Sequence, residues 1–566
     1  MKLTKKIILS FFVLFFSIKI NAQDLQQIKN AKLATVKGSI GTTNTVYGAS
    51  GITGRRVPFS WMLYGNATVT VKGFELPFSF VITEQNRDFR QPFNQLGISP
   101  KYKKLQMHFG WRNLQYSNYT LNGHTFLGVG ADYKIKKFSI GAMYGRLLKA
   151  VPEDSAKSIA NSGAQLPYAA YNRIGYAAHI GYGNDKRNIK IIYLKAKDND
   201  GSLSKKPIKS VVAPAENVVL GIKSKLGFAK HFTWDIDAAL SGYTRDTRAA
   251  DYPTDGEPRL QKLKSIFTAK LSSSFYYAGE SSLGFKEKNY SIKVKYQRIL
   301  PDYKSMGMYF VQTDVDRKTL EANWNDLKNT VSFSGSLGLE KDNLTNKKIA
   351  STARKIGSLN ANYTPSQKFG VQASFMNYGT TQSPGLKSIN DTVRLDQVTN
   401  SIIIVPHYTI IKQKLIHNIV LSLSNQSLND NNKFNSSNFN MNVSSATLNY
   451  VINLLKSNYA FDVSPFYIKS TIQAGDAVNI GGSVGASKSF LKNKLSNSLS
   501  ATYSTNTFNN VSNGYTIQGR YNVSYRVNKH HRLQVQAIYS NNNSISALVS
   551  RSFTETTGIL QYSYSF

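Results

Sequence analysis

The sequence contains no cysteine among its 566 residues. It therefore cannot form disulfides, bind metals through thiolates or use a cysteine nucleophile. Acidic residues are also scarce, with 32 Asp and Glu against 70 Lys and Arg, which gives a formal net charge of +38. Such a charge would suit a nucleic-acid-binding protein, but the basic residues are spread along the chain and do not gather in one soluble segment. We therefore expect no nucleic-acid partner.

Long apolar runs are missing as well. Beyond residue 22, no stretch approaches the ~20 apolar residues that a membrane-spanning helix needs. Residues 1–22 are predicted to be a cleaved secretory signal peptide, because a basic start, an apolar run and a small residue follow one another: Lys2, Lys5 and Lys6, then Ile7 to Ile18, then Ala22. We interpret residues 23–36 as a short periplasmic leader. An exported chain without a helical anchor is either soluble or a β-barrel.

What the sequence has in abundance is strand and turn residues, with 33 Tyr, 30 Phe and 39 Gly. In 290–297, apolar side chains alternate strictly with polar ones, and the same alternation occurs in 104–112, 127–135, 515–527 and 532–539. A period of two over so many residues predicts β-strands with one apolar and one polar face. The sequence is therefore predicted to be all-β.

Short turns, many with a lysine, separate the predicted strands in pairs. We place twelve of them near Gly73, Lys101, Lys136, Asp185, Lys230, Lys288, Lys328, Lys368, Lys412, Lys456, Lys492 and Lys529. They alternate with looser loops such as 151–170, 199–214, 246–262 and 380–395. This pattern predicts a single transmembrane antiparallel β-barrel of about 26 strands (24–26) over residues 37–566, with both termini periplasmic. A β-propeller has a similar repeat length but needs four short strands per repeat, whereas each repeat here holds two long strands.

The last strand shows the two faces most clearly. Its apolar face consists of Leu560, Tyr562, Tyr564 and Phe566, which alternate with Gln561, Ser563 and Ser565. A closing strand that ends on an aromatic residue resembles the signal read by the barrel-assembly machinery, so we expect these four apolar residues to form that signal. Tyrosines at strand ends are expected to form aromatic girdles at the membrane interfaces: Tyr116, Tyr119, Tyr144, Tyr539 and Tyr562.

The polar faces of several predicted strands are basic. The residues expected to point into the lumen are Arg112, Lys134, Lys293, Lys295, Arg520, Arg526 and Arg532. They could simply solvate a wet interior. Alternatively, a cationic interior or rim could favour anionic solutes or the phosphates of lipid A, since guanidinium and ammonium groups bind phosphate well.

No motif indicates catalysis or a metal. The eight histidines lie outside metal-ligand spacings, and no Ser, His and Asp set is singled out, so we predict no catalytic, cofactor or metal site and no enzyme. The stretch 118–128 is unusually specific in sequence for a loop and the start of a strand. Leu121 and Phe126 could pack it inward over the barrel mouth as a constriction, or it could be an ordinary loop.

Three stretches resemble uncharacterised outer-membrane β-barrel proteins of Bacteroidota. They are YTLNGHTFLG at 119–128 with GAMYGR at 141–146, GFKEKNYSIKVKYQRI at 284–299 with PDYKSMG at 301–307, and GLEKDNL at 338–344. The resemblance spans most of residues 40–380. It implies an envelope barrel and transfers no functional residues.

Together these features predict an integral barrel in the outer membrane of a Gram-negative bacterium. The favoured function is a wide pore or translocation channel for solute or polypeptide, gated by loops or a partner. A structural or accessory subunit of an envelope secretion or assembly complex is the alternative, and an outer-membrane enzyme is a third. The expected partners are outer-membrane lipid, lipopolysaccharide, the barrel-assembly machinery and a plugging or complex partner protein.

Overall fold

The structure is a computed structural model that describes residues 34–71, 74–84, 95–153, 169–205, 212–253, 266–267, 269–386, 394–432, 434, 439–545 and 552–566. The predicted signal peptide, most of the predicted leader and parts of the longer loops lie outside these residues. In the described part of the chain, no helix is long and apolar enough to cross a membrane.

The described chain consists almost entirely of β-strands, with one short 3-10 turn, η1 (Asp200–Ser202). The strands are β1 (Ala34–Ser50), β2 (Phe59–Val71), β3 (Phe74–Thr83), β4 (Gln95–Ile98), β5 (Lys101–Tyr102), β6 (Leu105–Gln115), β7 (Asn122–Ile135), β8 (Phe138–Leu148), β9 (Asn172–Gly183), β10 (Arg187–Asn199), β11 (Glu216–Phe228), β12 (Phe232–Thr244), β13 (Ser273–Lys286), β14 (Tyr290–Ile299), β15 (Val315–Asn325), β16 (Val331–Lys341), β17 (Ala350–Tyr363), β18 (Phe369–Pro384), β19 (Asp396–Ile411), β20 (Leu415–Asp430), β21 (Met441–Leu454), β22 (Tyr459–Ile472), β23 (Gly475–Phe490), β24 (Leu495–Phe508), β25 (Val511–Arg526), β26 (His531–Ser544) and β27 (Phe553–Ser565).

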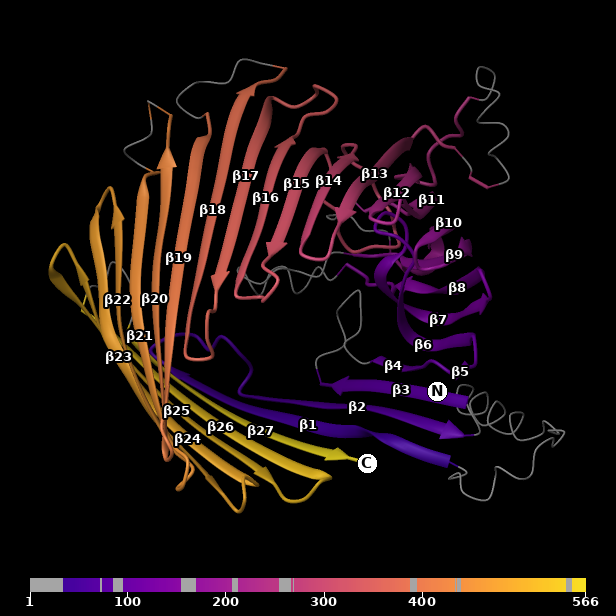
Figure 1. The fold of residues 1–566 in the computed structure, drawn as a ribbon. Coiled ribbons are helices and arrows are strands. Elements are labelled where there is room, and N and C mark those ends of the chain that lie inside the picture. Colours follow the sequence, from indigo (N-terminus) through magenta and orange to yellow (C-terminus); the bar gives the residue numbers. More distant parts are fainter. Residues whose placement is uncertain are drawn as a thin grey trace.

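Neighbouring strands pair antiparallel, and β1 pairs with β27 from Ser39↔Ser565 to Ser50↔Thr554, so the sheet closes on itself (Figure 1). β4 and β5 share one strand position, because both pair with β3 and with β6. The described residues therefore form a closed antiparallel barrel of 26 strands. The predicted fold class and strand number are confirmed.

The predicted short turns join strands at one end of the barrel. Lys136, Lys230 and Lys492 lie in three of them and have φ angles of 49°, 59° and 55°, the left-handed conformation that tight hairpins require. The turn predicted near Lys101 comes slightly later, at Lys103, which has a φ of 52°. β1 runs away from this end and β27 returns to it, so both ends of the described chain lie beside the turns. β1 already begins at Ala34, slightly before the predicted boundary at residue 37.

Two connections at the other end are tighter than the looser loops predicted there. β22 and β23 are joined by residues 473–474, and β24 and β25 by Asn509 and Asn510. Both asparagines have positive φ angles, 49° and 62°, which suits a two-residue hairpin turn. The Asn509 side-chain oxygen also accepts a hydrogen bond from the backbone amide of Asp476 at 2.8 Å, which ties the two turns together.

The strands have one apolar face that points outward. On β12, Leu240 is 64% exposed, whereas its neighbour Ala239, which points inward, is 4% exposed. Such a closed sheet with an apolar exterior is the arrangement of a transmembrane barrel, because lipid leaves no partner for an unpaired backbone group.

The aromatic girdle prediction is only partly right. Tyr144, Tyr539 and Tyr562 are exposed on the outer face as expected. Tyr116 and Tyr119 are not, since both are buried inside the barrel. The sequence misled because these tyrosines follow β6 in a loop that folds inward, so they no longer continue the alternation of the strand.

The seam between β1 and β27 ends on the terminal residue. The Phe566 amide donates to the Gly38 carbonyl and the Gly38 amide donates to the Phe566 carbonyl, each at 2.9 Å. The Tyr562 hydroxyl lies 2.6 Å from His531 Nδ1, and the Tyr564 ring lies 4.7 Å from the His531 ring. The residues of the predicted assembly signal therefore also fasten the last strand to both of its neighbours.

We predict that deleting Phe566 lowers the amount of assembled barrel, because it removes the last backbone pair of the seam together with the terminal aromatic ring. The Phe566→Ala variant keeps the backbone pair and separates the two contributions. The measurement is the fraction of the protein at the cell surface that resists unfolding by detergent without heating. Unchanged levels in the deletion variant would contradict the prediction.

Candidate functional site

The interior of the barrel has two different sides. Within the described residues, every buried hydrophobic side chain lies between Tyr47 and Val315, and none lies in β16–β27. Most of them form one cluster on the inner face of β6–β14, together with residues of two loops. We call residues 116–121 the inner loop and residues 300–314 the strap.

The inner loop lies against the inner faces of β12 and β13. The Asn118 amide donates to Asp237 Oδ2 at 2.9 Å, and the Asn118 side chain donates to Glu280 Oε1 at 3.1 Å. The Tyr119 hydroxyl donates to Glu280 Oε2 at 3.1 Å, and Leu121 is fully buried. The inward-folded loop considered from the sequence is therefore present, and it is held by polar anchors as well as by apolar packing.

The strap covers the inner loop. The Tyr303 hydroxyl donates to the Tyr119 carbonyl at 2.5 Å, and the Ser305 hydroxyl donates to the Thr120 carbonyl at 2.6 Å. Further along, the Gly307 carbonyl accepts a hydrogen bond from the Asn122 amide at 2.9 Å. The strap thus runs from the end of β14 back to the start of β7. Between these two strands, the inner loop lies on the barrel wall and the strap lies on the inner loop.

Burial keeps the tyrosines of this assembly neutral. Desolvation raises the pKa of the Tyr303 phenol, and the nearby Asp237 and Tyr119 add to the effect. Desolvation likewise raises the pKa of Tyr119, although a hydrogen bond from Gln297 opposes it. Both hydroxyls therefore remain hydrogen-bond donors over the physiological pH range.

A row of charged and polar side chains crosses the inner wall beneath and beyond the inner loop. Its members lie on successive strands from β12 to β17, each directly opposite the next: Asp237, Glu280, Gln297, Arg317, Glu340 and Arg354. Glu340 accepts hydrogen bonds from Arg317 Nε at 2.7 Å and from Arg354 at 2.6 Å. Because Glu340 is almost completely buried, these bonds offset the cost of removing its charge from water. The charged groups of this row therefore bind mainly one another and stabilise the wall, so few of them are available to a ligand.

The predicted basic residues differ in their partners, and Arg532 Nε donates a hydrogen bond to the Ser524 hydroxyl at 3.4 Å. Lys295 forms an ion pair with Glu280 at 2.8 Å, and Arg112 donates to the Ser79 hydroxyl at 2.8 Å. The wall therefore engages these two side chains.

The remaining predicted basic residues make no ion pair with a carboxylate in the described part of the chain. Lys134 and Lys293 lie close to short turns, and Arg520 lies within β25. Arg526 on β25 lies directly opposite Arg532 on β26, beside the turn that joins them. Like charges that face each other across a strand pair are unfavourable unless water or a ligand screens them.

The inner wall also carries a group of histidines that no sequence pattern predicted. His108 Nε2 and His179 Nε2 lie 3.3 and 3.4 Å from the two oxygens of Asp132, and the Ser99 hydroxyl lies 3.0 Å from His108 Nδ1. His108, Asp132 and His179 come from β6, β7 and β9, and Ser99 lies between β4 and β5, so only the strand register brings these residues together. Ser99 and both histidines are buried, which leaves a substrate no access to the hydroxyl. Among the described residues, no group of three or more His, Asp or Glu side chains is arranged to hold a metal ion.

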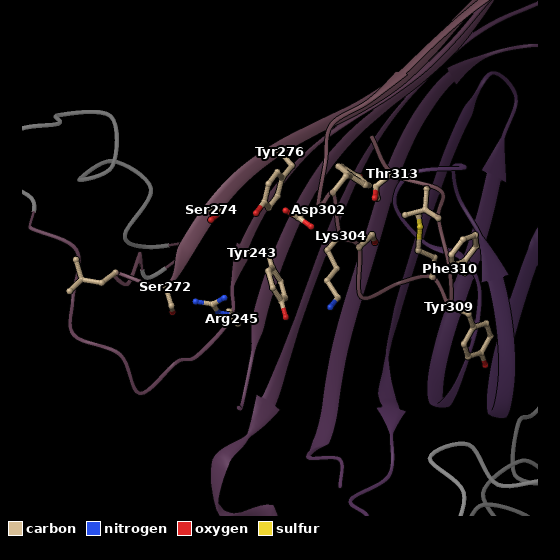
Figure 2. A pocket seen from close by; sticks show the side chains of 15 residues that line it. Tyr243, Arg245, Ser272, Ser274, Tyr276, Asp302, Lys304, Tyr309, Phe310 and Thr313 are labelled. Atoms are coloured by element: carbon tan, nitrogen blue, oxygen red, sulfur yellow. The ribbon is translucent and has the colours of Figure 1, made fainter. Parts of the chain in front are cut away.

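A pocket of about 580 Å³ lies beside the strap, at the end of the barrel opposite the short turns. β12, β13 and the strap supply its lining (Figure 2), which includes Tyr243, Arg245, Tyr276, Asp302, Lys304 and Phe310. In Figure 2, Tyr243 appears between Arg245 and Lys304. No residue of this pocket was predicted as a site, because loop residues that converge from separate connections share no sequence motif.

We predict that Gly307→Val loosens the strap from the wall. A side-chain carbon at this position would lie 2.8 Å from the Thr120 carbonyl oxygen and 3.1 Å from Leu121 Cα, both backbone atoms of the inner loop. The expected cost is about 1–3 kcal/mol, as for other overpacked sites, and trypsin should cleave faster after Lys304. Gly558→Ala is the matched control, because an added carbon there meets nothing within 4 Å. Equal cleavage rates in both variants would argue against a tightly packed strap.

Acidification should release the end of the strap from the loop that follows β16. Asp314 accepts hydrogen bonds from the amides of Asn343 and Leu344, each at 2.9 Å, and pairs with Lys348. Burial opposes ionisation of Asp314, but these hydrogen bonds and the lysine outweigh it and lower its pKa. A carboxyl with a lowered pKa contributes stability above its ordinary pKa of about 3.9, and this contribution is lost as the pH falls through the lower folded value.

Hydrogen exchange measured from pH 7 to pH 2 and corrected for intrinsic rates tests this expectation. The amides of Asn343 and Leu344 should be protected at neutral pH and lose protection only below the ordinary carboxyl range. In Asp314→Asn, protection should be weak at every pH. A wild-type profile that stays flat through this range would refute the role of Asp314.

Comparison with known proteins finds similarity to solved structures and none to protein families or curated sequences. No protein-family model matches it, and no curated protein sequence matches it. The P pilus usher (PapC) translocation pore is similar at 10% identity and a TM-score of 0.37, over 94% of this chain and 99% of that one. OccK8 (OprE) of Pseudomonas aeruginosa is similar at 11% identity and a TM-score of 0.33, over 66% of this chain and 97% of that one. A BenF-like porin from Pseudomonas fluorescens Pf-5 is similar at 11% identity and a TM-score of 0.31, over 62% and 92% of the two chains. Similarities this distant do not transfer a function to this chain.

Proposed function

We propose that this protein is a wide outer-membrane channel whose lumen is narrowed on one side by the strap and the inner loop. The observation that supports this function most directly is the inner face of β16–β27. In the described residues, no buried hydrophobic side chain lies in these strands, so no apolar plug is packed against them. A barrel of about 26 strands is wider than those whose interior side chains alone can fill.

The inner face of β16–β27 is hydrophilic. Hydroxyl and amide side chains pair across neighbouring strands, for example Ser336 with Ser358 at 2.9 Å, Ser424 with Ser445 at 2.7 Å and Gln536 with Asn522 at 2.8 Å. Such pairs satisfy each other without adding charge, and their remaining hydrogen-bonding capacity suits passing water and polar solutes. This lining supports passage of a hydrated solute or an extended polypeptide.

The direction of ion preference should follow from the arginines of β25 and β26. Arg520, Arg526 and Arg532 share the polar face of these strands, and within the described residues none of them has a carboxylate partner. Two facing guanidinium groups favour an anion between them, because an anion relieves their mutual repulsion. The channel is therefore proposed to prefer anions, and its location is proposed to be the outer membrane with both termini periplasmic.

Planar-bilayer recordings of the purified barrel test the proposal. We expect stepwise conductance and, in a KCl gradient, a reversal potential that shows anion preference. The double variant Arg526→Glu/Arg532→Glu should lower the anion-to-cation permeability ratio by about two-fold or more. Arg526→Lys/Arg532→Lys keeps both charges and should retain the preference. A membrane that stays sealed under voltage after verified insertion would exclude an open channel.

A further inference from the structure

The pocket beside the strap combines features that the channel proposal does not use. It lies where β12 ends and β13 begins, on the inside of the barrel end that carries the longer connections. Its volume of about 580 Å³ is in the ordinary range for small-molecule sites. A solute that enters from this end would meet the pocket before it reached the middle of the barrel.

The backbone of the strap is held in place where it contributes residues to the pocket. Tyr303 and Ser305 are buried against the wall. Asp302 and Lys304, which alternate with them along the strap, are exposed on the opposite side. The Lys304 carbonyl also accepts a hydrogen bond from the Ser241 hydroxyl at 2.6 Å. The backbone that carries Lys304 is therefore anchored before any ligand arrives, which lowers the entropic cost of binding.

Two cations of the pocket are available to an anion. Lys304 Nζ lies 5.0 Å from the centroid of the Tyr243 ring. Neither Lys304 nor Arg245 forms an ion pair with a carboxylate in the part of the chain that the structure describes. Each can therefore donate a charge-assisted hydrogen bond to a ligand without breaking an existing ion pair.

Aromatic rings supply the rest of the recognition surface. Tyr243, Tyr276, Tyr309 and Phe310 all line the pocket, and Phe310 is 83% exposed. Among the described residues these four rings do not stack on one another, so they do not form the narrow slot that would grip a flat nucleobase. The aromatic rings are distributed around the pocket, and hydroxyl groups lie between them. This lining suits a bulky ligand that has many hydroxyl groups and a ring with apolar faces.

We propose that this pocket binds a short acidic oligosaccharide. The carbohydrate ring faces would pack on Tyr276 and Phe310, and a carboxylate or sulfate on the sugar would accept hydrogen bonds from Arg245 and Lys304. Ser272 and Ser274 also line the pocket and offer hydroxyl groups to the sugar. This inference rests on the proposed channel, for which the pocket is a selective entrance site.

Calorimetric titration of the purified full-length barrel in detergent tests the inference. The probes are trigalacturonic acid and its trimethyl ester, which keeps the rings and removes the charges. The acid should bind, and the ester should bind about ten-fold more weakly or not at all. Arg245→Gln and Lys304→Gln should each weaken binding of the acid about ten-fold, whereas Lys328→Gln, which removes the same charge from a turn at the other end of the barrel, should leave it unchanged.

The exposed ring is tested separately. Phe310→Ala should weaken both probes, and Phe310→Tyr should restore them, because an exposed side chain can be changed without disturbing the fold. Equal affinity for acid and ester, no binding of either, or tighter binding of uridine monophosphate than of the acid would overturn the proposal. Conductance recorded from the same preparation separates the two ideas: conductance without binding rejects only the saccharide site, and binding without conductance rejects the channel.

Discussion

The structure depends on one constraint: a strand that faces lipid must find a partner for every backbone amide and carbonyl. Only closure meets this requirement, and here closure brings Gly38 and Phe566 together across almost the whole length of the chain. The pairing of the first strand with the last, and the position of both described ends beside the same turns, follow from it. The lysine-containing turns with positive φ also contribute to closure, because they return the chain within two to four residues and keep neighbouring strands in register.

Closure with 26 strands creates a second requirement, since so wide a ring cannot be filled by its own inward side chains. The chain meets it on one side only. The strap and the inner loop bury an apolar cluster against β6–β14, and their polar anchors reach Asp237 and Glu280 on the wall. The opposite wall has no such cluster in the described residues and instead pairs hydroxyls and amides across strands. The barrel therefore has a packed side, β6–β14, which holds the strap and the inner loop in place, and a hydrophilic side, β16–β27, which suits transport.

The parts of this architecture that obey a local period could be predicted from the sequence. Alternation along single strands identified the faces, and the turn residues gave the strand number. The interior depended on contacts between distant positions, such as the bond from Asn118 to Glu280, and no local pattern encodes these. Tyr116 and Tyr119 show the limit most clearly: read as a continuation of β6 they belong at a membrane interface, but the loop turns inward and buries them. The histidines around Asp132 were missed for the same reason, because register alone unites them.

The two halves also differ in how they treat charge, and this difference constrains any mechanism. Near the strap, acidic side chains are buried and matched by Arg317, Arg354 and Lys295, so that wall is nearly neutral to a passing solute. Within the described residues, the cations without a carboxylate partner include Arg245 and Lys304 at the pocket, and Lys134, Lys293, Arg526 and Arg532 close to the short turns. A solute that crosses the proposed channel would therefore meet positive charge at both ends, and Arg520 adds one positive charge between them on β25. Binding at an end can select a solute, while the uncharged hydroxyl and amide pairs of β16–β27 between the ends bind it only weakly. A channel needs both properties to select a solute and still conduct it.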